Sequence, residues 1–456
     1  MAYLSRYDIL YSPVWGKYME RLIEHDLLKW KNRPDRKPLI IHGARQVGKS
    51  HTLLEFGKAN YGNVAYFFLE NNERLQAVFN NGIDKISTLF LDLGQLSGQT
   101  ITPGGTLVIF DEIQACPAAI TALKRIQETA NEYHVACAGS LLGLALNRDA
   151  KYSFPVGKVD ILNMYPMNFK EFLMAANRKG LADMIGEHFE KDKKLSSPMH
   201  ELALEEYRVY SAVGGMPECV QEYANRGDFD FVRAKQLAIC EIYTNDMVKY
   251  CTRTEAMRNI AAYNSVPAQL AKENKKFQFN IIRSGARSKD FADSIIWLEK
   301  ANIVIKVPKT NEGKMPLAGY EDLLSFKIYL SDVGLLAAKS SLPASAILTG
   351  AYGGEMRGAV TENFVAQELA ANRIRPYYWE SRGTAELDFV IQQQDKIVPI
   401  EAKAGANTKA KSLDSFRKKY NIEKSIRVSA KNFGYENGIK SVPLYAVWCI
   451  APDVAL

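Results

Sequence analysis

A loop between an apolar run and a helical stretch constrains this chain more than any other feature of its sequence. Residues 43–50 read GARQVGKS and match the pattern G-x-x-x-x-G-K-[ST] at every position. Gly43 and Gly48 permit backbone conformations in which successive N–H groups turn inward around a phosphate. The apolar residues 39–41 predict a buried strand before the loop, and residues 50–60 predict a helix whose N-terminus faces the anion.

The side chains of this loop have the chemistry that a nucleoside triphosphate requires. Lys49 supplies a positive charge for the β- and γ-phosphates, and the hydroxyl of Ser50 is a ligand for Mg²⁺. The residues predicted to contact the nucleotide are Gly43, Ala44, Arg45, Gln46, Val47, Gly48, Lys49, Ser50, His51 and Ser140.

A second motif follows about sixty residues later, where the apolar stretch 106–114 (TLVIFDEIQ) runs into two carboxylates. We expect Asp111 to hold the Mg²⁺ shell and Glu112 to orient and deprotonate the attacking water. The alternative is a carboxylate pair that only caps a helix. Ser140 follows the predicted strand 134–140 and is expected to face the γ-phosphate, although ordinary turn chemistry also explains a serine there.

Composition excludes several classes of protein. The chain has 456 residues, which suffices for about two to four domains, and no apolar run approaches the roughly 20 residues that cross a bilayer. Charged residues of both signs in the first twenty positions argue against a signal peptide. The six cysteines are scattered without a C-x-x-C pair, which predicts free thiols in a reducing cytoplasm.

Positive charge is concentrated near the C-terminus. Residues 403–440 contain ten Lys or Arg and three Asp or Glu, whereas the net charge of the whole chain is only +7. Such a density suits a polyanion such as DNA, and a solvated helix face with turns explains it equally well.

The stretch 256–307 predicts short helices, then a longer helix with Ile295, Ile296 and Leu298, a turn at Asn302 and an alternating strand. This order is typical of a winged helix, whose last helix can enter a DNA major groove. A winged helix used only for domain packing is the alternative. The basic residues that accompany the pattern are Lys272, Lys275, Lys276, Arg283, Arg287 and Lys289.

The last part of the chain predicts an α-β-β-β-α-β-β order. The predicted elements are a helix at 356–372, strands at 376–381, 385–393 and 396–405, a helix at about 408–420 and strands at 425–429 and 443–450. Asp388 lies among apolar neighbours, and Glu401 and Lys403 project from one face of the next strand. Buried charges need partners or a metal, so these residues, with Glu362, predict a Mg²⁺ site that holds a water for phosphodiester attack.

Four segments of the first part together resemble the AAA-type ATPases of bacteria and archaea, relatives of the archaeal ATPases and of origin-recognition proteins. The segments are GARQVGKS, VIFDEIQ, AGS and VDILNMYPMNFKEFL. The resemblance implies a five-stranded αβα core that binds ATP and Mg²⁺, with Ser140 as its sensor. Lys158 stands where relatives often carry an arginine finger, which leaves Arg148 as the nearby alternative. The turn Gly214-Gly215-Met216-Pro217 also matches these ATPases, in which a lid follows the core.

The order Glu362, Asp388 and Glu401-x-Lys403 resembles the PD-(D/E)xK nucleases, and the surrounding sequence looks like the domain of unknown function that accompanies these ATPases. The resemblance implies Asp388, Glu401 and Lys403 as catalytic residues and Glu362, Asp388 and Glu401 as metal ligands. The proline of the motif's name is absent, because Glu386-Leu387 precedes Asp388. The alternative is a buried Asp–Lys–Glu network in a domain retained for binding.

The predicted fold is α/β with four parts. These are an ATPase core at 1–175, a helical lid at 176–255, a winged-helix-like module at 256–325 and a nuclease-like domain at 326–456. The leading hypothesis is an ATPase whose nucleotide state controls a DNA-facing C-terminal part. Two alternatives are a nucleotide-gated switch that binds a protein partner through a catalytically silent scaffold, and a regulator of transcription type. A membrane partner is not expected, and a homo-oligomer is left open.

Overall fold

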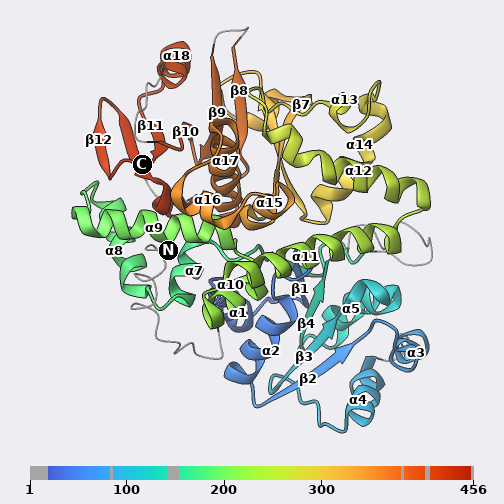
Figure 1. Cartoon of the computed structure of the whole chain (residues 1–456). Helices are drawn as coiled ribbons and strands as arrows, with labels where there is room; N and C mark the ends of the chain where they lie inside the picture. The colour runs from blue at the N-terminus through green and yellow to red at the C-terminus, as the bar shows by residue number, and fades with distance from the viewer. Residues whose placement is uncertain (1–18, 83–85, 141–153, 382–384, 406–410, 453–456) are drawn as a thin grey trace.

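The computed structural model describes residues 19–82, 86–140, 154–381, 385–405 and 411–452. Two β-sheets lie at opposite ends of this part of the chain, and long helices run between them (Figure 1). No helix within the described ranges has the length and apolar character needed to cross a membrane.

The N-terminal sheet has five parallel strands in the order β2-β3-β4-β1-β5. Their bounds are β1 Leu39–His42, β2 Asn63–Phe68, β3 Thr106–Asp111, β4 His134–Gly139 and β5 Asp160–Asn163. Every residue of β3 and of β4 is buried, because helices cover both faces of the sheet. The predicted five-stranded αβα core is therefore confirmed.

Alternate residues of each central strand enter separate cores. Ile41, Leu107 and Ile109 pack on one side of the sheet with Leu53 of α2, whereas Ile40, Val108 and Phe110 pack on the other side with α3, α4 and α5. The helices of this part are α1 Ile23–Asn32, α2 Lys49–Asn60, α3 Glu73–Gly82, α4 Ile86–Ser97, the 3₁₀ turn η2 Ile113–Ala115 and α5 Pro117–Thr129.

A helical region follows the first sheet. Asn168 begins it by accepting the backbone N–H of Glu171, whose carboxylate accepts the N–H of Asn168 in return, so a complete capping box starts α7. The helices are α7 Phe169–Ala175, α8 Lys179–Glu190, α9 Ser197–Val213, α10 Pro217–Arg226, α11 Phe229–Tyr250, α12 Arg253–Leu270, α13 Phe279–Ile282 and α14 Ser288–Lys300. The long helix α11 runs between the two sheets (Figure 1).

The C-terminal sheet has eight strands in the order β12-β13-β11-β10-β9-β8-β6-β7. Their bounds are β6 Val304–Thr310, β7 Glu321–Leu330, β8 Tyr377–Glu380, β9 Glu386–Gln393, β10 Lys396–Ala402, β11 Ser425–Ser429, β12 Gly434–Glu436 and β13 Ile439–Pro443. The antiparallel pair β6–β7 follows α14, in the predicted helix-then-strand order, and joins the larger sheet because Lys309 pairs in parallel with Tyr378. The domain boundary predicted after residue 325 falls inside β7.

The remaining elements pack on this sheet and on α9. They are the 3₁₀ turn η4 Leu317–Tyr320, α15 Val333–Lys339, α16 Ala344–Thr349, α17 Gly354–Ala371, α18 Lys411–Tyr420 and the 3₁₀ helix η5 Leu444–Cys449. The strand predicted at 443–450 is wrong, because β13 ends at Pro443 and η5 follows. This run is apolar without alternation, and such runs fit a buried helix as well as a buried strand. Tyr445, Ala446 and Val447 are all buried.

Candidate nucleotide site and C-terminal charged cluster

The phosphate loop needs its two glycines for different physical reasons. A Cβ at Gly43 would lie 2.1 Å from the carbonyl oxygen of Met164, so only glycine fits beside the segment after β5. Gly48 has φ +94°, a conformation that other residues rarely adopt, and directly precedes α2. Gln46 also has a positive φ, of 69°. The loop therefore has the tight turns expected from the motif, and α2 begins at Lys49.

Lys49 is buried at the base of the loop, with only 7% of its surface exposed. Its Nζ donates hydrogen bonds to the carbonyl oxygens of Gly43 at 2.9 Å and Ala44 at 2.8 Å. Burial lowers the pKa of Lys49 to about 8, and the nearby carboxylates of Glu112 and Asp111 partly oppose that shift. An ammonium group that has already lost most of its water binds a phosphate at little further desolvation cost.

The predicted carboxylate pair lies at the end of β3, beside the loop. Asp111 accepts a hydrogen bond of 2.5 Å from the hydroxyl of Tyr66 and one of 2.9 Å from the backbone N–H of Glu112. Glu112 itself has φ +50°, and the backbone leaves the strand at this residue to begin η2. The amide of Gln114 donates to the carboxylate of Glu112. Neither Tyr66 nor Gln114 was predicted to act here: Tyr66 lies in β2 outside any motif, and Gln114 ends the segment VIFDEIQ without an assigned role.

Arg45 forms ion pairs with three carboxylates from three elements. Its guanidinium lies 3.4 Å from Glu70, which follows β2, and 3.7 Å from Glu112. It also pairs with Asp246 of α11. Sequence spacing could not predict this cluster, because Asp246 is 201 positions from Arg45 along the chain.

The other predicted residues of the nucleotide site differ in their surroundings. Ser50 is half-buried in the first turn of α2, and His51 is exposed beside it. Ser140 is buried directly after β4. Lys158 forms an ion pair of 3.0 Å with Glu128 of α5. The alternative arginine finger, Arg148, lies outside the described residues.

The donors at this site fit Mg²⁺. Ser50 and Asp111 offer a hydroxyl and a carboxylate, and oxygen ligands are those that Mg²⁺ prefers. Lys49 and Arg45 add the positive charges that a triphosphate requires. The structure thus brings Lys49, Asp111, Glu112 and Arg45 into one charged group, in which Lys49 interacts electrostatically with Asp111 and Glu112.

Arg21 supports the loop from the N-terminal side. Its guanidinium donates to the carbonyl oxygens of Val47 and Tyr165, both at 2.8 Å, and forms an ion pair of 3.0 Å with Glu171. This arginine is 6% exposed, so its hydrogen bonds are shielded from water. It was not predicted, because an isolated arginine ahead of a strand has no sequence signature.

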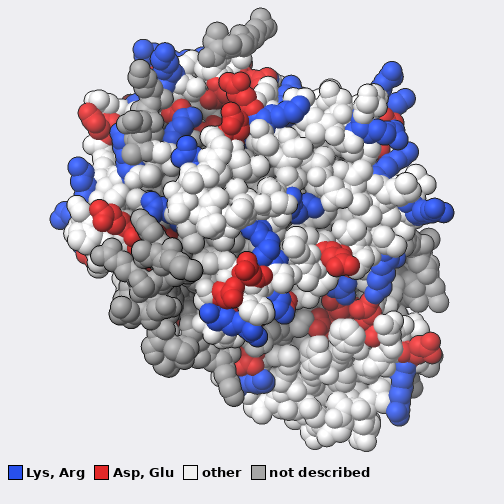
Figure 2. Space-filling view, in the orientation of Figure 1, with Lys and Arg blue, Asp and Glu red and all other residues white. Residues whose placement is uncertain are grey.

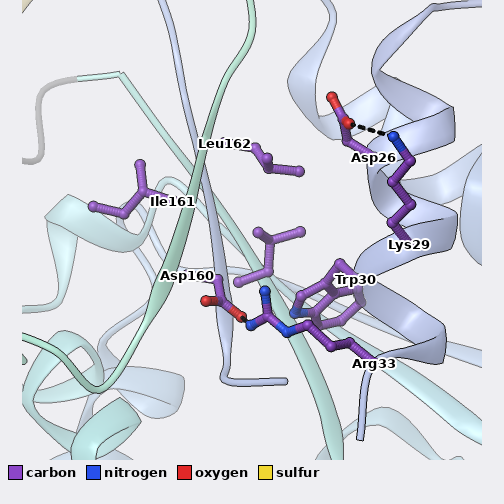
Figure 3. Close-up of a pocket in the computed structure, with 8 residues that line it drawn as sticks. Asp26, Lys29, Trp30, Arg33, Asp160, Ile161 and Leu162 are labelled. Carbon is purple, nitrogen blue, oxygen red and sulfur yellow. Dashed lines mark hydrogen bonds and ion pairs between the residues drawn. The ribbon is translucent and has the colours of Figure 1, made fainter. Parts of the chain in front are cut away.

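A pocket of about 230 Å³ lies between α1 and β5 (Figure 3). Its lining residues are Asp26, Lys29, Trp30, Arg33, Leu39, Asp160, Ile161 and Leu162. Arg33 crosses it to form an ion pair of 2.5 Å with Asp160. None of the phosphate-loop residues 43–50 lines this pocket, so it is separate from the nucleotide site.

The predicted C-terminal site is a buried cluster of carboxylates and lysines. Glu362 of α17 accepts a hydrogen bond of 2.6 Å from Lys275 and one of 2.9 Å from the hydroxyl of Tyr329. Lys327 of β7 lies 3.8 Å from Glu362 and also pairs with Glu386. Burial raises the pKa of Glu362, but the two lysines outweigh it and hold that pKa below its usual value.

Asp388, Glu401 and Lys403, on β9 and at the end of β10, lie beside this group. Burial and the charge of Glu362 raise the pKa of Asp388 to about 6, and its carboxylate accepts the backbone N–H of Ala402 at 2.9 Å. Lys403 pairs with Oε1 of Glu401 at 3.4 Å. The other carboxylate oxygen of Glu401 is buried, and no described residue donates a hydrogen bond to it.

The arrangement of this cluster does not fit a metal ion. Lys275 and Lys327 both form ion pairs with the carboxylate of Glu362, so their ammonium groups take the positions that a metal cation would need. Within the described ranges, no group of three or more histidine, cysteine, aspartate or glutamate side chains is disposed to hold a metal.

Basic side chains gather over α13 and α14 at the upper right of Figure 2. Arg283, Arg287 and Lys289 are exposed there. The exposed face of α14 also carries Asp293 and Ile296, so positive charge is concentrated at the start of this helix. Such a distribution suits contact with phosphates at one end of the helix better than insertion of its whole length into a groove.

Three segments of the chain match known sequence families. Residues 35–173 match a sequence family described as AAA domain. Residues 204–346 and 357–447 match two families described as domains of unknown function, DUF8612 and DUF4143. No curated protein matches the chain.

Three solved structures are distantly similar. A Walker-type ATPase of Pyrococcus abyssi is 15% identical, with 71% of this chain and 96% of that chain covered and a TM-score of 0.41. The ORC2 protein of Aeropyrum pernix in its ADP form is 11% identical, with 78% and 98% covered and a TM-score of 0.31. DnaA of Aquifex aeolicus with bound AMPPCP is 14% identical, with 64% and 91% covered and a TM-score of 0.26.

At these scores the structural likenesses decide nothing, and the assignment depends on the family match, the strand order and the phosphate loop. The N-terminal part of the chain, residues 35–173, is a P-loop domain of the AAA type.

Proposed function

We propose that this chain binds ATP with Mg²⁺ and hydrolyses it, and that the nucleotide state controls a DNA-facing C-terminal part. The observation that supports hydrolysis most directly is the proximity of Lys49, Asp111 and Glu112, which form one electrostatically coupled group. Phosphoryl transfer to water needs at least three groups: a lysine that binds phosphate, an aspartate that binds the metal and a glutamate that acts as a general base.

Each residue has a separate role in this proposal. Lys49 exchanges the carbonyl oxygens of Gly43 and Ala44 for phosphate oxygens. Ser50 and Asp111 hold Mg²⁺, which supplies charge neutralisation on the phosphates when it is bound. Glu112 orients the attacking water and accepts its proton, and the amide of Gln114 restrains that carboxylate. Ser140, at the end of β4, senses the γ-phosphate.

Two variants test the hydrolysis. Lys49→Ala is expected to lose ATP binding, whereas Glu112→Gln is expected to bind ATP and lose turnover by roughly a hundredfold or more. Lys124→Ala, an exposed lysine of α5, is the control and should turn over ATP at the normal rate. Phosphate release and calorimetric titration measure the two properties separately. Unchanged turnover in both variants would contradict the proposal.

Contact with DNA is the second component of the proposal. It is supported by the exposed Arg283, Arg287 and Lys289 and by the basic stretch 403–440. Binding to duplex DNA should weaken steeply with salt and should differ between ATP and ADP. Replacing the three basic residues with alanine should weaken duplex binding by about tenfold or more at low salt. Salt-insensitive binding, or none, would remove this component.

A catalytically silent C-terminal scaffold that binds a protein partner is the second candidate. The ion pairs of Lys275 and Lys327 with Glu362 favour it, since they neutralise the carboxylate that a metal-dependent nuclease would need. Incubation with plasmid, linear and branched DNA and Mg²⁺ or Mn²⁺ separates the candidates. Cleavage that disappears in Asp388→Ala would support a nuclease, whereas intact DNA throughout would support the scaffold.

A further inference from the structure

Helix α11 contacts the nucleotide site through its last two turns. Asp246 pairs with Arg45 of the phosphate loop, and the hydroxyl of Tyr243 donates a hydrogen bond of 3.0 Å to the carbonyl oxygen of Arg45. Lys249 pairs with Glu70, and the hydroxyl of Tyr250 lies 3.4 Å from the same carboxylate. Four residues of one helix thus bind the phosphate loop and Glu70, which follows β2.

The charges of this contact oppose an incoming polyanion. Asp246 is 5% exposed, and its carboxylate interacts electrostatically with Lys49 as well as with Arg45. A triphosphate that binds Lys49 therefore meets the negative charge of Asp246 nearby. Arg45 is at the same time the cation that a triphosphate would attract, and it is also 3.7 Å from Glu112.

We propose that Arg45 conveys nucleotide occupancy to α11, because a bound triphosphate competes with Asp246 for the guanidinium and so releases the helix from the phosphate loop. This inference rests on the proposed ATP binding and names how that binding is regulated. The competition depends on the γ-phosphate end of the nucleotide, since Glu112, which Arg45 also contacts, is the residue proposed to act there.

The release of α11 has consequences beyond the nucleotide site. Tyr243 lies against Tyr263 of α12, with ring centroids 6.5 Å apart. At its other end α11 meets α15, where a Cβ at Gly334 would lie 2.7 Å from the amide nitrogen of Gln236. A shift of α11 therefore has to displace α12 and α15, which pack on the C-terminal sheet.

Asp246→Asn tests the competition, because it removes the charge and keeps the shape. We expect it to tighten ATP binding by about threefold to tenfold and ADP binding by less. In an Arg45→Gln background the same substitution should give a smaller gain, since only like-charge repulsion is then relieved. Glu241→Gln, an exposed carboxylate on the same helix, should leave both affinities unchanged.

Hydrogen exchange measures the release itself. ATP should speed exchange of the backbone amides in residues 243–250 of the wild-type chain, and Asp246→Asn should show fast exchange with ADP as well. Tyr243→Phe breaks the other bond to the loop without a change of charge. It should loosen α11 and alter ATP and ADP affinity by the same factor, and it serves as the second variant if Asp246→Asn does not fold.

The outcomes are separable. Weaker or unchanged ATP binding in Asp246→Asn, or an equal gain with and without Arg45, would overturn the inference while leaving ATP binding intact. Failure of the wild-type chain to bind ATP would instead overturn the proposed function. Thermal melting of each variant without nucleotide identifies any that are unfolded.

Discussion

At the scale of single residues, burial has shifted several protonation equilibria of this chain away from their ordinary values. Lys49 has a pKa of about 8 and Glu368 a pKa of about 8, in both cases chiefly because burial disfavours the charged form. The two shifts have opposite signs, since one group is a base and the other an acid. The pKa of Lys49 predicts how ATP affinity depends on pH, and the pKa of Glu368 predicts how the stability of the fold depends on pH.

The first prediction concerns ATP affinity. A protonated Lys49 binds phosphate, so affinity should be flat below pH about 8 and should fall above it by up to about tenfold per pH unit, because one proton is involved. Titration of ATP from pH 7 to pH 9.5 measures this. An affinity that stays constant across the whole range would mean that Lys49 keeps its proton throughout.

The second prediction concerns stability. Glu368 is fully buried, and its folded-state pKa of about 8 exceeds the ordinary value of 4.5. The folded state therefore binds the extra proton, and stability should decrease as pH rises from 4.5 through 8. Glu368→Gln should raise the melting temperature near pH 8.5 by about 2–4 °C or more and should flatten the pH profile. Glu355→Gln, exposed on the same helix, should do neither.

At the scale of elements, the turn Gly214-Gly215-Met216-Pro217 is packed more tightly than its motif suggests. Gly214 has φ +78°, and a Cβ at Gly215 would lie 1.9 Å from the carbonyl oxygen of Met167. The backbone N–H of Gly215 donates to the buried carboxylate of Asp332 at 2.6 Å. The turn connects α9 to α10 along the chain, and its hydrogen bond to Asp332, the N-cap of α15, fixes it to the start of that helix.

Gly215→Ala is accordingly expected to destabilise the chain severely, by about 3 kcal/mol or more, because a backbone atom blocks the new methyl group. Gly180→Ala is the matched comparison. It lies in α8 with no atom within 4 Å of the added Cβ, and it should stabilise by about 0.5–1 kcal/mol through helix propensity. Denaturant unfolding measures both. Similar stabilities would contradict this account of the turn.

The sequence predicted the elements whose signal is local. The strand before Gly43, the helix after it, the apolar run into Asp111 and the strand pattern around Asp388 all depend on neighbouring residues, and the structure contains these elements. Partners that are distant in the chain, such as Asp246 for Arg45 or Lys275 and Lys327 for Glu362, could not be predicted. Ion pairs between distant elements leave no periodic pattern in the sequence, so only the fold reveals them.

At the scale of the whole molecule, one continuous set of contacts joins the nucleotide site to the C-terminal cluster. A Cβ at Gly48 would lie 3.5 Å from Pro217, and the turn before Pro217 binds Asp332. The next backbone N–H, that of Val333, donates to Gln367 of α17, the helix that also carries Glu362. The path between the two predicted sites thus consists of close packing at Pro217, followed by the buried hydrogen bonds of Asp332 and Gln367.

The domain boundary predicted after residue 325 would cut β7 in two, which leads to a prediction about fragments of the chain. A chain cut after residue 325 leaves half of β7 behind and removes β8, the neighbour of β6 in the sheet. We expect residues 1–325 alone to aggregate or to lack a cooperative melting transition, whereas the full chain melts cooperatively. Circular dichroism during heating measures this. A sharp transition in the fragment would show that the first three predicted parts fold without the fourth.

Because β6 and β7 complete the C-terminal sheet, the hairpin that follows α14 cannot turn as a separate wing. The basic start of α14, which packs on β6, and the cluster around Asp388 on β9 consequently belong to the same sheet. If DNA contacts both of them, as proposed above, the separation of its two contacts is set by this shared sheet.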